Sequence, residues 1–210
     1  MNQLRRTGPT AFSSVMTAAT LLVTLALSAC APSYTLVAAA PQQVASNTLH
    51  VTPGTLWNRA PKSPLDVRWQ ENWTANGALL DSIIFVGGVP DGQAIAKQRA
   101  KADRQVPVFR ATMTAPDLVA MIESYYRITA GAAVFEAGDV TPVTFIGKPG
   151  LRFDYSYVGQ DNVCRRGRSV MAISGSKLYL MSVAGAALHY YAAALADFDA
   201  MAASASVGRS

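Results

Sequence analysis

The stretch Leu151-Arg152-Phe153-Asp154-Tyr155-Ser156-Tyr157-Val158 decides the fold class, because large apolar side chains occupy every second position from residue 151 to residue 157. This alternation places them on one face of an extended chain, which predicts a half-buried β-strand. A short strand over residues 143–146 precedes it, separated by a Gly-Lys-Pro-Gly turn. Two apolar runs, over residues 169–173 and 177–183, flank Ser174-Gly175-Ser176 and predict a hairpin.

Two helices are predicted, over residues 115–128 and 187–203. Thr114 is a favoured N-cap, Pro116 suits a first turn, and the Asp117 carboxylate complements the positive end of the helix dipole. The apolar residues of the first helix are Leu118, Met121, Ile122 and Tyr125. Those of the second are Leu188, Tyr191, Leu195, Phe198 and Met201. Their spacing of three and four gives each helix an apolar face that can pack on a sheet.

An earlier hairpin is predicted from residues 67–74 and 79–86, which flank Asn76-Gly77. An Asn-Gly pair between two strand-like runs favours a two-residue turn. The order of elements is then strands, helix, strands, helix, and most connections between strands are hairpins. The sequence therefore predicts an α+β fold, in which a mainly antiparallel sheet packs against two helices.

The N-terminus has the pattern of an export signal. Arg5 and Arg6 precede an apolar stretch over residues 11–27, and small residues follow it. The stretch is short for a helix that spans a bilayer, which needs about 20 apolar residues. We interpret residues 1–29 as a signal peptide that is removed from the mature protein.

The signal ends in Leu27-Ser28-Ala29-Cys30, which resembles the lipobox of bacterial lipoproteins. The resemblance implies that the Cys30 thiol carries a diacylglyceryl group and that the amino group freed by cleavage is acylated, for example by palmitate. Two or three chains would anchor the protein stably, since each buried CH₂ contributes about 0.8 kcal/mol. Ala31 stands where such proteins commonly carry an Asp for retention at an inner membrane, which implies an outer-membrane anchor facing the periplasm.

The mature chain divides into three parts. Residues 30–46 are rich in Ala, Pro, Gln and Ser, so we expect a lipidated N-terminus and a flexible tether. Residues 47–204 would form a single α+β domain, and residues 205–210 a frayed tail. Loss of the two arginines in the signal leaves 16 Lys and Arg against 13 Asp and Glu, and this charge of +3 does not indicate a nucleic-acid partner.

Several short motifs resemble a group of uncharacterised proteobacterial lipoproteins. In the first half they are Trp73-Thr74, Asn76-Gly77, Leu79-Leu80-Asp81 and the segment 87–92. In the second half they are Phe145-Ile146-Gly147, the segment 150–155 and Leu178-Tyr179. The C-terminal half is also similar to PsbP-like domains in its order of a strand, a hairpin and a closing helix. Both resemblances imply a fold and no particular chemistry.

Few residue patterns in the chain are typical of catalysis. His50 and His189 are the only histidines, no HExxH motif or Gly-rich phosphate loop occurs, and Ser174 lacks the Gly-x-Ser-x-Gly context of a nucleophile. We therefore predict that the protein is not an enzyme and has no catalytic, cofactor or metal site.

Cys164 is the one thiol left if Cys30 is lipidated. The arginines that follow it could lower its pKa and favour the reactive thiolate. Burial as a small inert residue is the interpretation we favour. A thiol enzyme at Cys164 is the weakest of the functional hypotheses.

Two groups of residues are candidates for an interaction surface. Trp57, Trp69 and Trp73 fall within 17 residues, and an exposed aromatic patch can bind a sugar or a partner. A second group is Arg165, Arg166 and Arg168, which could contact anionic lipid or another protein. For both groups a structural role is the interpretation we favour, in core packing or at a solvated strand entrance.

The leading hypothesis is a membrane-anchored periplasmic lipoprotein that acts as a non-catalytic interaction or envelope-associated module. Its partners would be the membrane, through the lipid on Cys30, and an envelope protein. The alternative is a small-ligand or glycan-binding protein that uses the Trp-rich hairpin.

Overall fold

The computed structural model describes residues 33–62, 66–98 and 105–208. Residues from Tyr34 to Ser210 form one compact unit. Within the described residues no helix combines the length and apolar character needed to cross a membrane. The predicted signal peptide and the Leu27–Cys30 motif lie outside the described residues.

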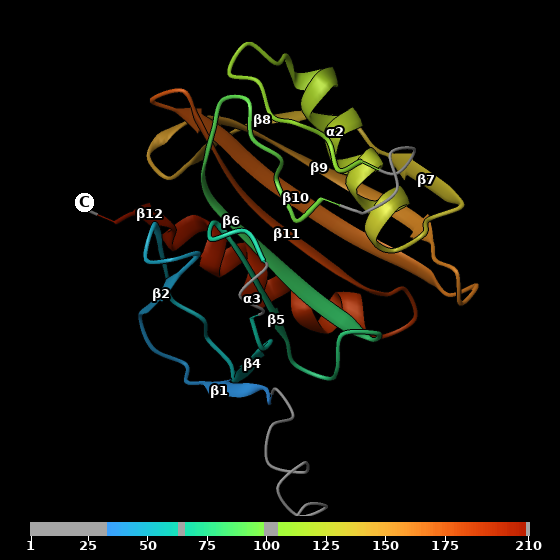
Figure 1. Ribbon diagram of the computed structural model, residues 1–210. Coiled ribbons are helices and arrows are strands. Elements are labelled where there is room, and N and C mark those ends of the chain that lie inside the picture. Colours follow the sequence, from blue (N-terminus) through green and yellow to red (C-terminus); the bar gives the residue numbers. More distant parts are fainter. Residues whose placement is uncertain (1–32, 63–65, 99–104, 209–210) are drawn as a thin grey trace, which may run out of the picture. The chain divides into compact units, whose positions relative to one another are not determined.

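A nine-stranded antiparallel sheet is the centre of the compact unit (Figure 1). Its path runs β1-β4-β5-β6-β11-β10-β9-β7, and β8 pairs with β9 beside β7. The strands are β1 (Thr35–Val37), β4 (Trp57–Arg59), β5 (Gln70–Thr74), β6 (Asp81–Pro90), β7 (Val134–Ala137), β8 (Thr141–Phe145), β9 (Lys148–Val158), β10 (Cys164–Ser174) and β11 (Lys177–Ala186). A second, three-stranded sheet has the order β12-β3-β2, from β2 (Gln42–Val44), β3 (Leu49–Val51) and β12 (Ser206–Val207).

The large sheet has a hydrophobic core on each face. Helix α2 (Ala115–Thr129) packs on one face, where Leu118, Met121 and Ile122 join Phe153 and Tyr155 of β9. Helix α3 (Tyr190–Ser204) and the small sheet cover the other face, and Figure 1 shows the two helices on opposite sides. The predicted α+β class is therefore confirmed.

The β10–β11 hairpin turns where the sequence predicts, but the predicted Gly147–Gly150 turn is wrong, because residues 148–150 already belong to β9 and pair with β8. β8 and β9 meet at Ile146-Gly147 and β10 and β11 at Gly175-Ser176, and all four residues have positive φ angles between 50° and 70°. Two consecutive left-handed residues match the right-handed twist of the flanking strands, which is why Gly occurs in both turns. Strand β9 contains the entire alternating stretch from Leu151 to Val158.

The first hairpin is longer at its turn than the sequence predicts. β5 and β6 pair, but a six-residue connection over 75–80 replaces a two-residue turn at Asn76-Gly77. Asp81 is 2 % exposed and accepts hydrogen bonds from the Thr74 hydroxyl and from the backbone amides of residues 75 and 76. A buried carboxylate that receives this many donors fixes the wider loop.

The predicted tether and tail are both corrected by the structure. Residues 35–37 and 42–44 form strands, and Val37 and Val44 are buried in the core under α3. Residues 206–207 form β12, which pairs with β3, so these two residues belong to the fold. The folded unit therefore extends beyond the predicted 47–204 at both ends, because short segments of low periodicity become strands once a partner strand is beside them.

Candidate functional site

The three tryptophans do not form an exposed surface. Trp57 and Trp73 are each 1 % exposed and belong to the core under α3, whereas Trp69 packs partly buried against the core on the α2 face. All three indole N–H groups donate hydrogen bonds within the unit: Trp57 to Asp197, Trp73 to Glu71 and Trp69 to the Ala94 carbonyl oxygen. The proposed Trp-rich binding surface is therefore wrong, and the packing interpretation holds for these residues.

Two of the three arginines are also occupied inside the unit. Arg165 is 7 % exposed and donates to both carboxylate oxygens of Asp161 and, at 2.7 Å, to the Leu79 carbonyl oxygen. These bonds lower the pKa of the Asp161 carboxyl. Arg165 therefore ties the turn after β9 to the connection between β5 and β6, and it is not a free surface cation.

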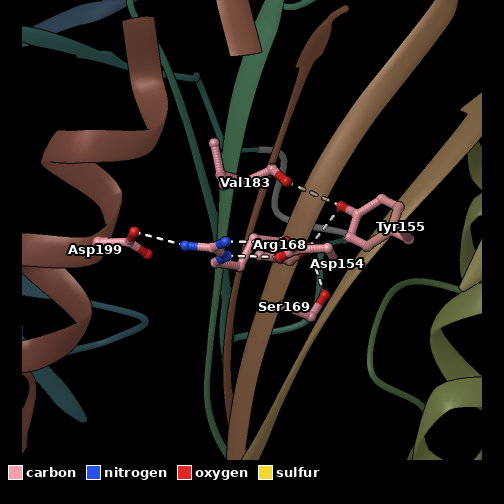
Figure 2. A network of polar contacts seen from close by, with 7 residues as sticks. Asp154, Tyr155, Arg168, Ser169, Val183 and Asp199 are labelled. Atoms are coloured by element: carbon pink, nitrogen blue, oxygen red, sulfur yellow. Dashed lines mark hydrogen bonds and ion pairs between the residues drawn. The ribbon is translucent and has the colours of Figure 1, made fainter. Parts of the chain in front are cut away.

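Arg168 connects the sheet to α3 (Figure 2). Its guanidinium forms two bonds with Asp154 of β9, at 2.6 and 2.9 Å, and a third with Asp199 of α3 at 2.6 Å. Hydrogen bonding to Arg168 is the main reason why the pKa of Asp154 is lowered. The planar fork of an arginine suits such bidentate pairing, so Arg168 positions α3 on the sheet.

Only Arg166 remains exposed among the three predicted arginines. Its guanidinium lies 5.6 Å from the centroid of the Tyr191 ring and forms no ion pair within the described residues. Arg166 therefore stays available for contact with an anionic surface.

A buried hydroxyl network, which the sequence did not indicate, lies under α2. The Tyr155 hydroxyl is 2.6 Å from that of Tyr126 and 2.8 Å from that of Ser182. It donates to the Val183 carbonyl oxygen at 3.0 Å (Figure 2). Ser169 extends the chain from the neighbouring strand, 2.9 Å from Ser182. Burial raises the pKa of the Tyr126 and Tyr155 hydroxyls well above the ordinary value, so both stay neutral at a pH at which an exposed tyrosine ionises. The network satisfies polar groups in an apolar layer, as a structural role requires.

Cys164 lies at the start of β10 and is exposed, contrary to the favoured prediction that it is buried. Neither His50 nor His189 forms a hydrogen bond with it in the described part of the chain. Among the described residues no group of three His, Cys, Asp or Glu side chains could hold a metal ion.

A hollow with a mainly apolar lining lies between α2 and the sheet. Its volume is about 370 Å³, which suits a small ligand. The lining comes from the first turns of α2, from the start of β8 and β9, and from the end of β10, and it includes Leu118, Pro142, Leu151 and Ile173. Sequence reasoning could not find this pocket, because its residues have the same apolar spacing as ordinary core residues.

Comparison with known proteins finds no match among protein-family models and none among curated proteins. Among solved structures, the chain is similar to LpqN, described as involved in cell envelope biogenesis of Mycobacterium tuberculosis. The two chains are 11 % identical, the match covers 86 % of this chain and 87 % of LpqN, and the TM-score is 0.34.

Proposed function

We propose that this chain is a lipoprotein of the cell envelope, anchored through Cys30, whose folded unit acts as a non-catalytic interaction module at the membrane surface. The lipobox-like motif supports a lipid anchor at Cys30. The position of β1, only a few residues after Cys30, supports a folded unit that lies close to the membrane surface. Because β1 begins at Thr35 and Val37 is buried, Ala31, Pro32 and Ser33 alone separate Cys30 from the compact unit.

The short connection limits how far the folded unit can lie from its lipid. An extended chain advances at most about 3.6 Å per residue, so the four steps from Cys30 to Tyr34 span about 14 Å. A tether of the length expected from composition would reach several times further. In this proposal the folded unit therefore works next to the lipid headgroups, within the periplasm and at the outer membrane.

Mass spectrometry of the mature protein, purified from a bacterial envelope, tests the anchor. We expect an N-terminus at Cys30 with a diacylglyceryl thioether and a further acyl chain. Cys30→Ser should abolish incorporation of an alkyne-bearing fatty acid, while Cys164→Ser, which removes the other thiol, should keep it. An unmodified Cys30 in mature protein overturns the proposal.

A second variant tests whether the lipidated protein is placed in the outer membrane. Ala31→Asp should move the lipidated protein from the outer-membrane to the inner-membrane fraction on a density gradient. A wild-type protein that already fractionates with the inner membrane contradicts the outer-membrane assignment. Photo-crosslinking in cells would then identify the envelope protein that the module contacts, and repeated failure to capture one partner argues against an interaction role.

Small-ligand binding is a second candidate function, supported by the 370 Å³ apolar pocket under α2. A fluorescent fatty acid is a suitable test molecule for such a lining. Val140→Trp should fill the pocket mouth and abolish binding, whereas Val207→Trp, at a site of similar exposure in the small sheet, should not. Equal binding by wild type and Val140→Trp excludes this pocket as the site.

A further inference from the structure

The large exposed apolar side chains of the unit concentrate at one end of the nine-stranded sheet. Leu188 and Leu79 are almost wholly or mostly solvent-exposed, at 103 % and 74 %. We name the set the apolar end, and its members are Leu36, Leu56, Leu79, Val134, Val163 and Leu188. Contiguous exposed apolar side chains mark a surface that binds a partner or a membrane.

Hydrogen bonds hold the central part of the apolar end together. The Ala187 amide donates to the Cys164 carbonyl oxygen at 3.1 Å, and the Ala186 amide donates to the Leu80 carbonyl oxygen at 2.9 Å. The Arg165 side chain, at the start of β10, also donates to the Leu79 carbonyl oxygen. The connections that carry Leu79, Val163 and Leu188 are therefore neighbours, and they lie together at the lower right of Figure 1.

The strand register extends this end across the sheet in both directions. Val134 of β7 lies opposite Val158, which lies opposite Cys164 of β10. On the other side Leu36 of β1 lies opposite Asn58, whose side-chain amide donates to the Ala75 carbonyl oxygen. Leu56 directly precedes β4, so it lies at the same end as residue 75.

The opposite end of the sheet has a different character. Its turns carry Lys148 next to Gly147, and Lys177 next to Ser176, and these residues are exposed. The apolar residue in these turns, Ile146, is 8 % exposed and packs into the core. The two ends of the sheet therefore differ in their exposed leucines, although the apolar end also carries polar turn residues such as Asp161.

Charge at the apolar end is balanced. Arg165 is neutralised by Asp161 and Arg127 by Glu123, whereas the exposed Arg166 and the exposed Glu136 of β7 have no ion pair within the described residues. A surface of exposed leucines with an unpaired arginine fits the boundary between acyl chains and anionic headgroups.

We infer that the apolar end inserts its leucines into the headgroup and acyl boundary of the lipid bilayer that holds the protein. The inference rests on the proposed lipid anchor, because the chain that bears Cys30 enters the folded unit through β1, which itself contributes Leu36. The lipid then holds the protein at the membrane, and the apolar end fixes the orientation of the sheet on it. The Lys-bearing turns consequently face away from the bilayer.

The exposed Cys164 provides a reporter inside the apolar end. Lipidated full-length mature protein, labelled at Cys164 with an environment-sensitive fluorophore, would be reconstituted in vesicles of phosphatidylethanolamine and phosphatidylglycerol with brominated acyl chains. We expect blue-shifted emission and strong quenching. The same fluorophore on Lys177→Cys, in a Cys164→Ser background, should remain unquenched.

A double variant tests the leucines directly. Leu79→Asn with Leu188→Asn should reduce the ratio of inserted to free reporter at least about tenfold, because binding at an interface scales with buried apolar area. Val108→Asn with Val207→Asn, two exposed valines outside the apolar end, should leave the ratio unchanged.

Flotation of the vesicles separates the two proposals. Protein that does not float has no membrane anchor, and both the proposed function and this inference fail. Protein that floats with an unquenched reporter at Cys164 keeps its anchor and overturns only the insertion. That second result would leave the apolar end as a surface for a protein partner.

Discussion

Trp57 donates its indole N–H to a carboxylate oxygen of Asp197 at 2.7 Å, across 140 residues of sequence. The same carboxylate accepts from the Gly54 amide at 2.5 Å and from the Thr55 hydroxyl at 2.8 Å. Asp197 is 9 % exposed, so these bonds form away from most of the solvent. One side chain of α3 therefore fixes both the segment before β4 and the indole ring of Trp57.

Asp197→Ala should reduce the free energy of unfolding by about 1.5–3 kcal/mol, because the buried Trp57 indole N–H loses its charged acceptor. Urea denaturation followed by tryptophan fluorescence measures the change. Asp199→Ala is the matched control in the same helix, since its carboxylate is 44 % exposed and should contribute about 1 kcal/mol or less. Equal losses in the two variants would contradict the role given to Asp197.

Gly167→Ala should destabilise the protein by about 1–3 kcal/mol, as over-packing of a core does. A Cβ atom at residue 167 would overlap the Tyr155 ring, and φ at this glycine is not positive, so the loss is steric. Gly147→Ala distinguishes a steric clash from backbone strain, because a Cβ atom at residue 147 meets no atom within 4 Å although φ is +70°. The Gly147→Ala control should lose about 1 kcal/mol of stability from backbone strain. Its near-UV circular dichroism, which reports the packing of the tyrosines, should be unchanged.

Stability should fall as the pH is lowered from about 5 to about 2. The pKa values of Asp154 and Asp161 are lowered in the folded protein, mainly by hydrogen bonds from Arg168 and Arg165. Stability from a lowered carboxyl pKa is present above the ordinary value and is lost as the pH falls through the folded value. Asp161→Asn should therefore flatten the acid dependence of the urea midpoint. Asp139→Asn, which removes an exposed carboxylate, should not.

Alkaline titration should reveal three tyrosines that resist ionisation. Burial raises the pKa of Tyr157 to about 12 and holds those of Tyr126 and Tyr155 well above the ordinary value. Their contribution to stability is complete below the ordinary tyrosine pKa of about 10 and is lost as the pH rises through the raised values. Phenolate absorbance should show these three of the eight tyrosines ionising together with unfolding. Gradual ionisation of all eight in folded protein would contradict the network.

Cys164 should react fully with a maleimide in the folded, lipidated protein, because its side chain is exposed. Intact-mass spectrometry should show one added group, since a thioether at Cys30 leaves no second thiol. Cys164→Ser should add none. Two added groups would mean that Cys30 carries no lipid, and no added group would mean that Cys164 is covered.

The elements predicted correctly are those whose signal is local. The alternation from Leu151 to Tyr157 gives β9, and the cap at Thr114 with the spacing from Leu118 to Tyr125 gives α2. The Ser174-Gly175-Ser176 turn gives the β10–β11 hairpin. Periodicity and turn residues act within a few residues of chain, so they can be recognised without knowing the neighbours.

The elements missed depend on a partner far along the chain. β1 is three residues long and becomes a strand by pairing with β4, and β12 does so by pairing with β3. The candidate surface failed for the same reason. Nothing near Trp57 in the sequence indicates that Asp197 will meet its indole, and nothing near Arg168 indicates Asp154 and Asp199.

The sequence by itself determined the fold class, the principal helix and hairpins, and the expectation of a lipid anchor, because each rests on residues that are adjacent or regularly spaced. Only the tertiary structure decided which aromatic and charged side chains are buried and that one end of the sheet is apolar. Burial and charge pairing depend on which distant segments meet, and the chain acquires that information when the sheet and its two helices pack together.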